Sequence, residues 1–226
     1  MKKLLVLLGI MALAVPAFGA SSDISSGSID SNSCVDRDMI YCQSPQGSAM
    51  NASSAFDAEL SDDMPDGMAG QAFNVVGGWV LEWSGTWMNP TGVTINIYNG
   101  ECPPDLAPAY SYYFAWGDMF TQYDPQGGFD TYYFEAMLPD VITIEAGMSV
   151  GFVAEISWGQ NAPYVGCALG ATTTGCGSAY WAGDYWGYPR WYSAAAYGYP
   201  YDLAYCLGYT VTAAEEATFS AVKSLY

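Results

Sequence analysis

Apolar and polar side chains alternate along several short stretches in the middle of the chain. Between residues 93 and 98, Val93, Ile95 and Ile97 alternate with two polar side chains and a tyrosine. A period of two places successive side chains on opposite faces of an extended strand. The pattern therefore predicts a strand with one buried face and one face toward water.

The same period recurs at residues 148–158, where Val150, Phe152 and Ala154 share one face. Short runs of this kind, separated by Gly, Pro, Asn and Asp, are typical of strands joined by turns. The predicted strands are residues 73–76, 79–87, 93–98, 110–116, 131–137, 141–144, 149–158 and 203–211. This succession predicts an all-β fold, an antiparallel β-sandwich of the jelly-roll-like or Ig-like kind.

Composition sets the boundaries of the predicted domain, which spans residues 69–211. Residues 20–68 are rich in Ser, Asp, Asn and Gly, and we expect them to form a flexible N-terminal arm. Within the domain, residues 159–202 hold many Tyr and Trp side chains without a clear period. This segment predicts long aromatic loops, which are common places for binding sites on a rigid β scaffold.

Residues 1–19 have the features of a secretory signal peptide. Lys2 and Lys3 precede an apolar run, and Ala17 and Gly19 fit the small-residue positions of a cleavage site. The run is shorter than the roughly 20 apolar residues that span a bilayer. We therefore expect a mature chain that begins near Ala20, has no membrane span, and is secreted by a bacterium to the extracellular medium or the cell surface.

The chain is strongly acidic. Five Lys and Arg residues oppose 23 Asp and Glu residues, so the formal net charge is −18, and removal of the leader makes it more negative. Nucleic acid and anionic membrane surfaces are therefore poor partners. We interpret the acidity as a means of keeping an aromatic-rich chain soluble outside the cell.

Six cysteines behind a signal peptide predict disulfides, because exported compartments are oxidising. The spacing favours two local bonds and one long-range bond, namely Cys34–Cys42, Cys167–Cys176 and Cys102–Cys206. A zinc site is disfavoured, because the chain has no histidine and no C-x-x-C pair. Residues 62–67 match a calcium loop only in part, since Met64 stands where an oxygen ligand belongs. We interpret this segment as a solvated turn, and we predict no metal site and no cofactor.

The lack of histidine also excludes Ser-His-Asp and Cys-His catalysis. A carboxylate pair for glycoside hydrolysis remains as a less favoured alternative. The acids on or beside predicted strands are Glu82, Glu135, Glu145 and Glu155. We interpret them as side chains of the solvated faces and expect a protein that is not an enzyme.

The aromatic loops support two hypotheses without catalysis. In the first, exposed rings stack on sugars beside polar groups, and the predicted ligand-binding residues are Trp181, Asp184, Trp186, Trp191 and Tyr192. In the second, the same rings bury against another copy of the chain and build a surface layer or fibre. A sugar site leaves two or three coplanar rings exposed in a groove with carboxamide or carboxylate neighbours, whereas an assembly interface leaves a broad apolar patch.

Several segments resemble extracellular β-sandwich modules of secreted and surface proteins from environmental bacteria. They are the strands that open at Phe73 and Trp79, the segment 93–98 with its Pro-rich turn at 102–104, and the segments 138–147 and 202–205. Members of that group often have paired acids before the opening Phe, whereas this chain has Gln71 and Ala72. The resemblance implies an extracellular sandwich, and no role of those acids carries over.

Residues 212–226 predict a short C-terminal helix, because Phe219, Val222 and Leu225 lie at helical spacing. The segment 218–226 is also similar to short C-terminal sorting tags of the Thr-Trp-Gly-x-Ile-Lys type, from which it departs at Phe219 and the next residue. The sequence thus predicts a secreted, surface-associated, non-catalytic binding or structural module, with polysaccharide binding as the more specific alternative.

Overall fold

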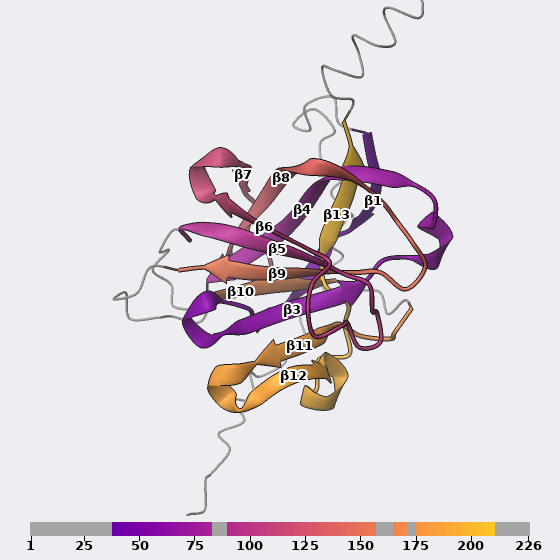
Figure 1. Cartoon of the computed structure of the whole chain (residues 1–226). Coiled ribbons are helices and arrows are strands. Elements are labelled where there is room, and N and C mark those ends of the chain that lie inside the picture. The colour runs from indigo at the N-terminus through magenta and orange to yellow at the C-terminus, as the bar shows by residue number, and fades with distance from the viewer. Residues whose placement is uncertain (1–37, 83–89, 157–164, 171–174, 211–226) are drawn as a thin grey trace, which may run out of the picture. The chain divides into compact units, whose positions relative to one another are not determined.

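A computed structural model describes residues 38–82, 90–156, 165–170 and 175–210 of the chain. Their backbone forms two β-sheets, and the named strands pair antiparallel throughout (Figure 1). The fold is therefore all-β, as predicted. The predicted signal peptide, C-terminal helix and sorting tag lie outside the described residues.

The smaller sheet has six strands in the order β12-β11-β3-β9-β5-β6. Its strands are β3 (Ala58–Asp63), β5 (Gly92–Tyr98), β6 (Tyr110–Ala115), β9 (Ser149–Glu155), β11 (Tyr180–Gly183) and β12 (Tyr188–Ser193). Strand β6 forms one edge and β12 forms the other. The predicted strand 93–98 matches β5, and its alternating Val93, Ile95 and Ile97 are fully buried.

The larger sheet has seven strands around the long β4 (Ala72–Glu82). Strand β8 pairs along one edge of β4, whereas β13 and then β10 pair along the other. The remaining strands of the larger sheet are β1 (Asp38–Gln43), β2 (Pro45–Asn51), β7 (Phe120–Tyr123), β8 (Asp130–Thr143), β10 (Val165–Gly170) and β13 (Tyr205–Tyr209).

Helical structure in the described ranges consists of short 3-10 turns. They are η1 (Ser54–Phe56), η2 (Asp66–Met68), η3 (Trp116–Asp118), η4 (Asp184–Trp186) and η5 (Ala194–Tyr197). No helix within these ranges has the length and apolar character to cross a membrane.

One apolar core joins side chains from both sheets. Phe134 of β8 and Phe152 of β9 meet edge to face, with ring centroids 5.4 Å apart. Gly78 of β4 lies under this pair, since a Cβ atom there would be 2.6 Å from a ring carbon of Phe152. The glycine therefore lets the two rings settle onto the backbone of β4, where a larger residue would have to displace them.

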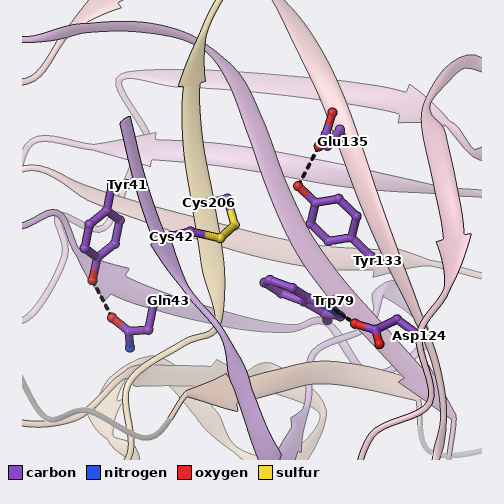
Figure 2. Close-up of a disulfide and its surroundings, with 8 residues drawn as sticks. All are labelled: Tyr41, Cys42, Gln43, Trp79, Asp124, Tyr133, Glu135 and Cys206. Atoms are coloured by element: carbon purple, nitrogen blue, oxygen red, sulfur yellow. Dashed lines mark hydrogen bonds between the residues drawn. A yellow bond between two sulfur atoms is a disulfide. The ribbon is translucent and has the colours of Figure 1, made fainter. Parts of the chain in front are cut away.

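A second, smaller cluster covers the other face of the larger sheet. It includes Trp79, Leu81 and Cys206, packed against Tyr133. The Trp79 indole N–H donates to Asp124 Oδ2 at 2.8 Å, and the Tyr133 hydroxyl donates to Glu135 Oε1 at 2.8 Å (Figure 2). Strand β4 is thus buried on both faces, which is why its residues form an almost continuous apolar run.

The disulfides differ from the predicted pairing. Cys42 bonds to Cys206 at paired positions of β1 and β13, as Figure 2 shows, and Cys102 bonds to Cys176. Cys167 is a free, buried thiol within β10. The predicted partners of these residues were wrong, because strand pairing between distant segments, and not closeness in sequence, decides which thiols meet. Cys34 lies outside the described residues.

One boundary of the predicted domain and the assignment of one stretch inside it also need correction. Residues 38–68 are not a loose arm, because β1, β2 and β3 in this segment are integral to the two sheets. Likewise, the stretch 159–202 is not only loops, because it contributes β10, β11 and β12. Small and polar residues in β2 and β10, with Gly and Ala at several positions, gave no visible alternation.

The predicted solvated turn at 62–67 is buried at its start. Asp62 and Asp63 end β3 and are 2% and 6% exposed. Asp62 Oδ2 accepts the backbone N–H of Leu203 at 2.9 Å, and Asp63 Oδ1 accepts that of Cys176 at 3.1 Å. These acids are therefore held by backbone donors that lie more than a hundred residues away in the sequence.

Candidate functional site

A surface pocket of about 270 Å³ lies where the two sheets meet at the start of β6. Its lining residues are Asn99, Tyr110, Val141, Ile142, Thr143, Glu145 and Met148. The volume is just below the range of roughly 300–1,000 Å³ that is typical of small-molecule sites. The pocket therefore has the size for one small unit of a longer ligand.

The accessible surface of the pocket is mostly polar. Of its lining residues, Ile142 and Met148 are only 3% and 4% exposed, whereas Asn99, Thr143 and Glu145 are exposed. Polar groups that converge beside an aromatic ring can orient a ligand that carries several hydroxyls. The rim offers an amide, a hydroxyl and a carboxylate.

Tyr110 forms the aromatic wall of the pocket. It begins β6, pairs with Ile97 of β5, and is 41% exposed. Its ring lies nearly parallel to that of Tyr112, with an interplanar angle of 14° and ring centroids 6.3 Å apart. Residues two apart on a strand point to the same side, so β6 presents these two rings in one row.

Tyr112 connects the two sheets beside the pocket. Its hydroxyl donates to Asp140 Oδ2 of β8 at 2.8 Å. Partial burial and this hydrogen bond raise the pKa of Tyr112 above its usual value, so the hydroxyl stays protonated and donates. The bond fixes the ring against which Tyr110 stacks.

A tight turn between β8 and β9 positions Glu145. The backbone N–H of Met148 donates to the Glu145 carbonyl at 3.3 Å, and the backbone N–H of Glu145 donates to Met148 Sδ at 3.1 Å. Gly147 in this turn has a φ of +81°, which glycine adopts without strain. A Cβ atom on Gly147 would be 3.7 Å from the Asn99 carbonyl oxygen, so the turn and the segment after β5 lie side by side.

The predicted ligand-binding residues lie at the opposite edge of the six-stranded sheet, on β11, η4 and β12. Trp181 is 7% exposed, belongs to the core, and donates its indole N–H to the Asn51 carbonyl at 2.8 Å. Trp191 is half-buried and meets Tyr98 edge to face. Asp184 is exposed. The side chain of Trp186 lies outside the described residues.

The rings in this region are tilted against one another instead of coplanar. Tyr188 meets Trp181 at 57°, Tyr192 at 79° and Tyr197 at 80°. Arg190 lies over the Tyr192 ring at 6.0 Å. Edge-to-face contacts hold aromatic side chains together, so the structure explains these rings as packing of β11 and β12, and their ligand binding stays a prediction.

A separate polar network lies on the six-stranded sheet around Glu59 of β3. Its Oε1 accepts hydrogen bonds from Asn96 Nδ2 at 2.9 Å and from the Tyr98 hydroxyl at 2.8 Å. Burial of the carboxyl raises the pKa of Glu59 to about 7, against the lowering effect of these two donors. Gly151 of β9 leaves the space for this carboxyl between β3 and β5.

The acids considered for catalysis are spread over different elements. Glu135 is buried on β8, Glu155 accepts a hydrogen bond from the Thr94 hydroxyl on β5, and Glu145 lines the pocket. The side chain of Glu82 is not among those described. Within the described ranges, no group of three or more Cys, Asp or Glu side chains is arranged to hold a metal ion.

Sequence reasoning placed Tyr110 in a strand but not in a site. Asn99 lies 11 residues before Tyr110, and the remaining lining residues lie 31 to 38 residues after it, so only the pairing of the strands brings them together. The signal that could have identified the site is the spacing of Tyr110, Tyr112 and Phe114, which puts three rings on one face of an edge strand. Comparison of the chain with family models, with curated proteins and with solved structures finds no match.

Proposed function

We propose that the protein is a secreted, surface-associated, non-catalytic β-sandwich module that binds polysaccharide at the Tyr110 pocket. The observation that supports this most directly is the near-parallel pair Tyr110 and Tyr112 at a pocket with amide, hydroxyl and carboxylate groups on its rim. Flat aromatic faces pack against the apolar faces of sugar rings, and rim groups accept or donate hydrogen bonds to the hydroxyls.

Two further observations support parts of this proposal, one for an oxidising compartment and one for the sandwich architecture. The described residues contain two disulfides, and such bonds persist in oxidising compartments. The sheets share one core through the contact of Phe134 and Phe152, which is the packing expected of a sandwich. Export itself rests on the leader-like sequence of residues 1–19.

A first test compares two tyrosines of the same strand. Tyr110→Ala removes the aromatic wall, and we expect it to weaken polysaccharide binding at least tenfold, because a stacking aromatic at the centre of a site contributes about 1.4 kcal/mol or more. Tyr113→Ala is the matched control, since Tyr113 is 58% exposed on the opposite face of β6. Binding is measured by isothermal titration and by tryptophan emission with a panel of soluble polysaccharides.

The result that contradicts the proposal is equally specific. If the two variants bind alike, the pocket is not the site. If the wild-type chain binds no member of the panel, polysaccharide binding itself is rejected. Circular dichroism of both variants shows whether the sheets remain intact.

A structural role is the second candidate, and one observation favours it. Strand β6 is an edge strand without a charged residue or a proline, and three of its residues are exposed. Edges of this kind are prone to pair with another chain. Light scattering of the full chain measures the oligomeric state and so tests this structural role. Assembly without any glycan supports pairing of β6 between copies, and a monomer at high concentration rejects this pairing.

A further inference from the structure

The charge around the Tyr110 pocket is negative. Glu145 lines the pocket, and Asp140 is held beside it by the Tyr112 hydroxyl. The chain has only five Lys and Arg residues, and Arg190 is the one that falls within the described ranges. Arg190 lies on β12, at the edge of the sheet opposite to β6, and its guanidinium faces Tyr192.

This arrangement selects against anionic sugars. A glycan with carboxylate or sulfate groups would meet Glu145 at the rim and a molecule of net charge −18, with no described cation at the site to offset the repulsion. A protonated amine, in contrast, would meet a carboxylate at the rim and an aromatic face in the wall. Both are favourable partners for an ammonium group.

We propose that the Tyr110 pocket recognises a glycan built of amino sugars whose amines are free and protonated. The inference rests on the proposed polysaccharide binding and specifies its ligand class. Tyr110 stacks on the sugar ring, Glu145 pairs with the ammonium group, and Asn99 and Thr143 bind hydroxyls. Ile142 and Met148, which are nearly fully buried, also line the pocket.

The expected preference is moderate, because the rim is solvated. An exposed ion pair contributes a factor of about two to five in affinity, and an ammonium over an aromatic ring contributes about as much. Together these give a preference of about tenfold for the free amine over its acetylated form. Salt screens such contacts, so the preference falls as ionic strength rises.

The test uses the full chain with disulfides formed and two matched ligands, a glucosamine hexamer and an N-acetylglucosamine hexamer. Titration calorimetry is run at low and at high salt at about pH 5.5. At this pH amines are protonated and ordinary carboxyls are ionised. We expect the glucosamine hexamer to bind about tenfold tighter at low salt, and the gap to close at high salt. A galacturonate hexamer is expected to show no binding.

Two variants locate the effect. Glu145→Gln removes the ion pair and is expected to reduce the preference from about tenfold to about threefold, the part that the aromatic face contributes. Asp184→Asn removes an equal charge from the exposed η4 turn beside β11, and the preference is expected to survive it. The same reduction in both variants would mean that net charge alone attracts the amine, and it would overturn the inference.

The remaining outcomes separate this inference from the function on which it rests. Equal affinity of the wild-type chain for both hexamers, with loss of binding in Tyr110→Ala, overturns the amine preference and leaves polysaccharide binding in place. Absence of binding to every glycan rejects the function, and the inference with it. A tetralysine peptide that binds as tightly as the glucosamine hexamer would identify a general cation site and overturn the sugar assignment.

Discussion

Glu59 shows how one buried acid links the fold to pH. Its carboxyl lies between β3 and β5 and accepts hydrogen bonds from Asn96 and Tyr98. Burial raises the pKa of Glu59 from 4.5 to about 7. Between these two pH values, the folded chain keeps a proton on Glu59 that the unfolded chain has released. This contribution to stability is complete at pH values below about 4.5 and is lost as the pH rises through about 7.

The variant Glu59→Gln tests this linkage. The amide resembles the protonated carboxyl and does not ionise, so we expect the variant to be more stable than the wild type by about 1–3 kcal/mol at pH 7.5 and nearly equal to it at pH 4.5. Urea unfolding at the two pH values measures the difference. Glu145→Gln, an exposed acid, is the control, with an expected change within about 0.5 kcal/mol at both pH values. A pH-independent effect of Glu59→Gln would contradict the linkage.

Distant segments supply surroundings that the local sequence does not show. Asp62 was predicted to lie in a solvated turn, but it is buried and accepts a hydrogen bond from the backbone of Leu203, and the charge of Asp202 lies close to it. Trp181 was predicted to bind a ligand because it lies in an aromatic stretch; it is a core side chain of β11, and its ligand binding stays a prediction. The local sequence shows which residue types are present, but the pairing of distant strands decides what surrounds each residue.

At the scale of elements, strands in stretches with clear alternation or many β-branched and aromatic residues were predicted, and strands in small, polar or aperiodic stretches were not. Residues 93–98 of β5 were identified correctly, but the face predicted to meet water is mostly covered, because Asn96 and Tyr98 are 7% and 3% exposed and bond to Glu59. Strand β2 was missed because its residues are small or polar and packing in the larger sheet, not propensity, keeps it extended. The pocket draws on the ends of β5, β6 and β8 together, so no single segment could predict it.

The bond between β1 and β13 gives a prediction for the edge of the larger sheet. Cys42 and Cys206 are separated by 164 residues, and a cross-link over so long a segment restricts the unfolded chain strongly. We expect the double variant Cys42→Ala, Cys206→Ala to lose about 2–5 kcal/mol of unfolding free energy in urea under non-reducing conditions.

The control for this prediction is Cys167→Ala. Cys167 is a free thiol inside β10, so the variant removes a sulfur atom and leaves both disulfides in place. Its loss is expected to be about 1 kcal/mol. If the double variant loses no more than this control, the disulfide contributes little and strand pairing alone holds β1 in the sheet.

At the scale of the whole molecule, buried and exposed acids both destabilise the folded chain at neutral pH. Burial raises the pKa of Asp62, with smaller contributions from Asp202 and Asp63, and burial also raises the pKa of Asp63. With a net charge of −18, the folded chain also repels itself at neutral pH. Both effects diminish as acids become protonated.

We therefore expect the folded chain to gain thermal stability as the pH falls from about 8 to about 5. The raised folded-state pKa values of Glu59, Asp62 and Asp63 mean that the folded chain binds more protons than the unfolded chain in this range. Calorimetry at several pH values checks it, and added salt should raise Tm at pH 8 more than at pH 5. A Tm that falls steadily toward pH 5 would contradict this account.

The position of the pocket at the junction of the sheets has a mechanical consequence. Tyr110 belongs to the six-stranded sheet, whereas Val141, Ile142 and Thr143 belong to the end of β8 in the other sheet. A polysaccharide bound there, as proposed, would contact both sheets at once. Because a ligand that binds only the folded state stabilises it, and does so more strongly as its concentration exceeds its Kd, attachment to a solid matrix would oppose separation of the two sheets at the point of attachment.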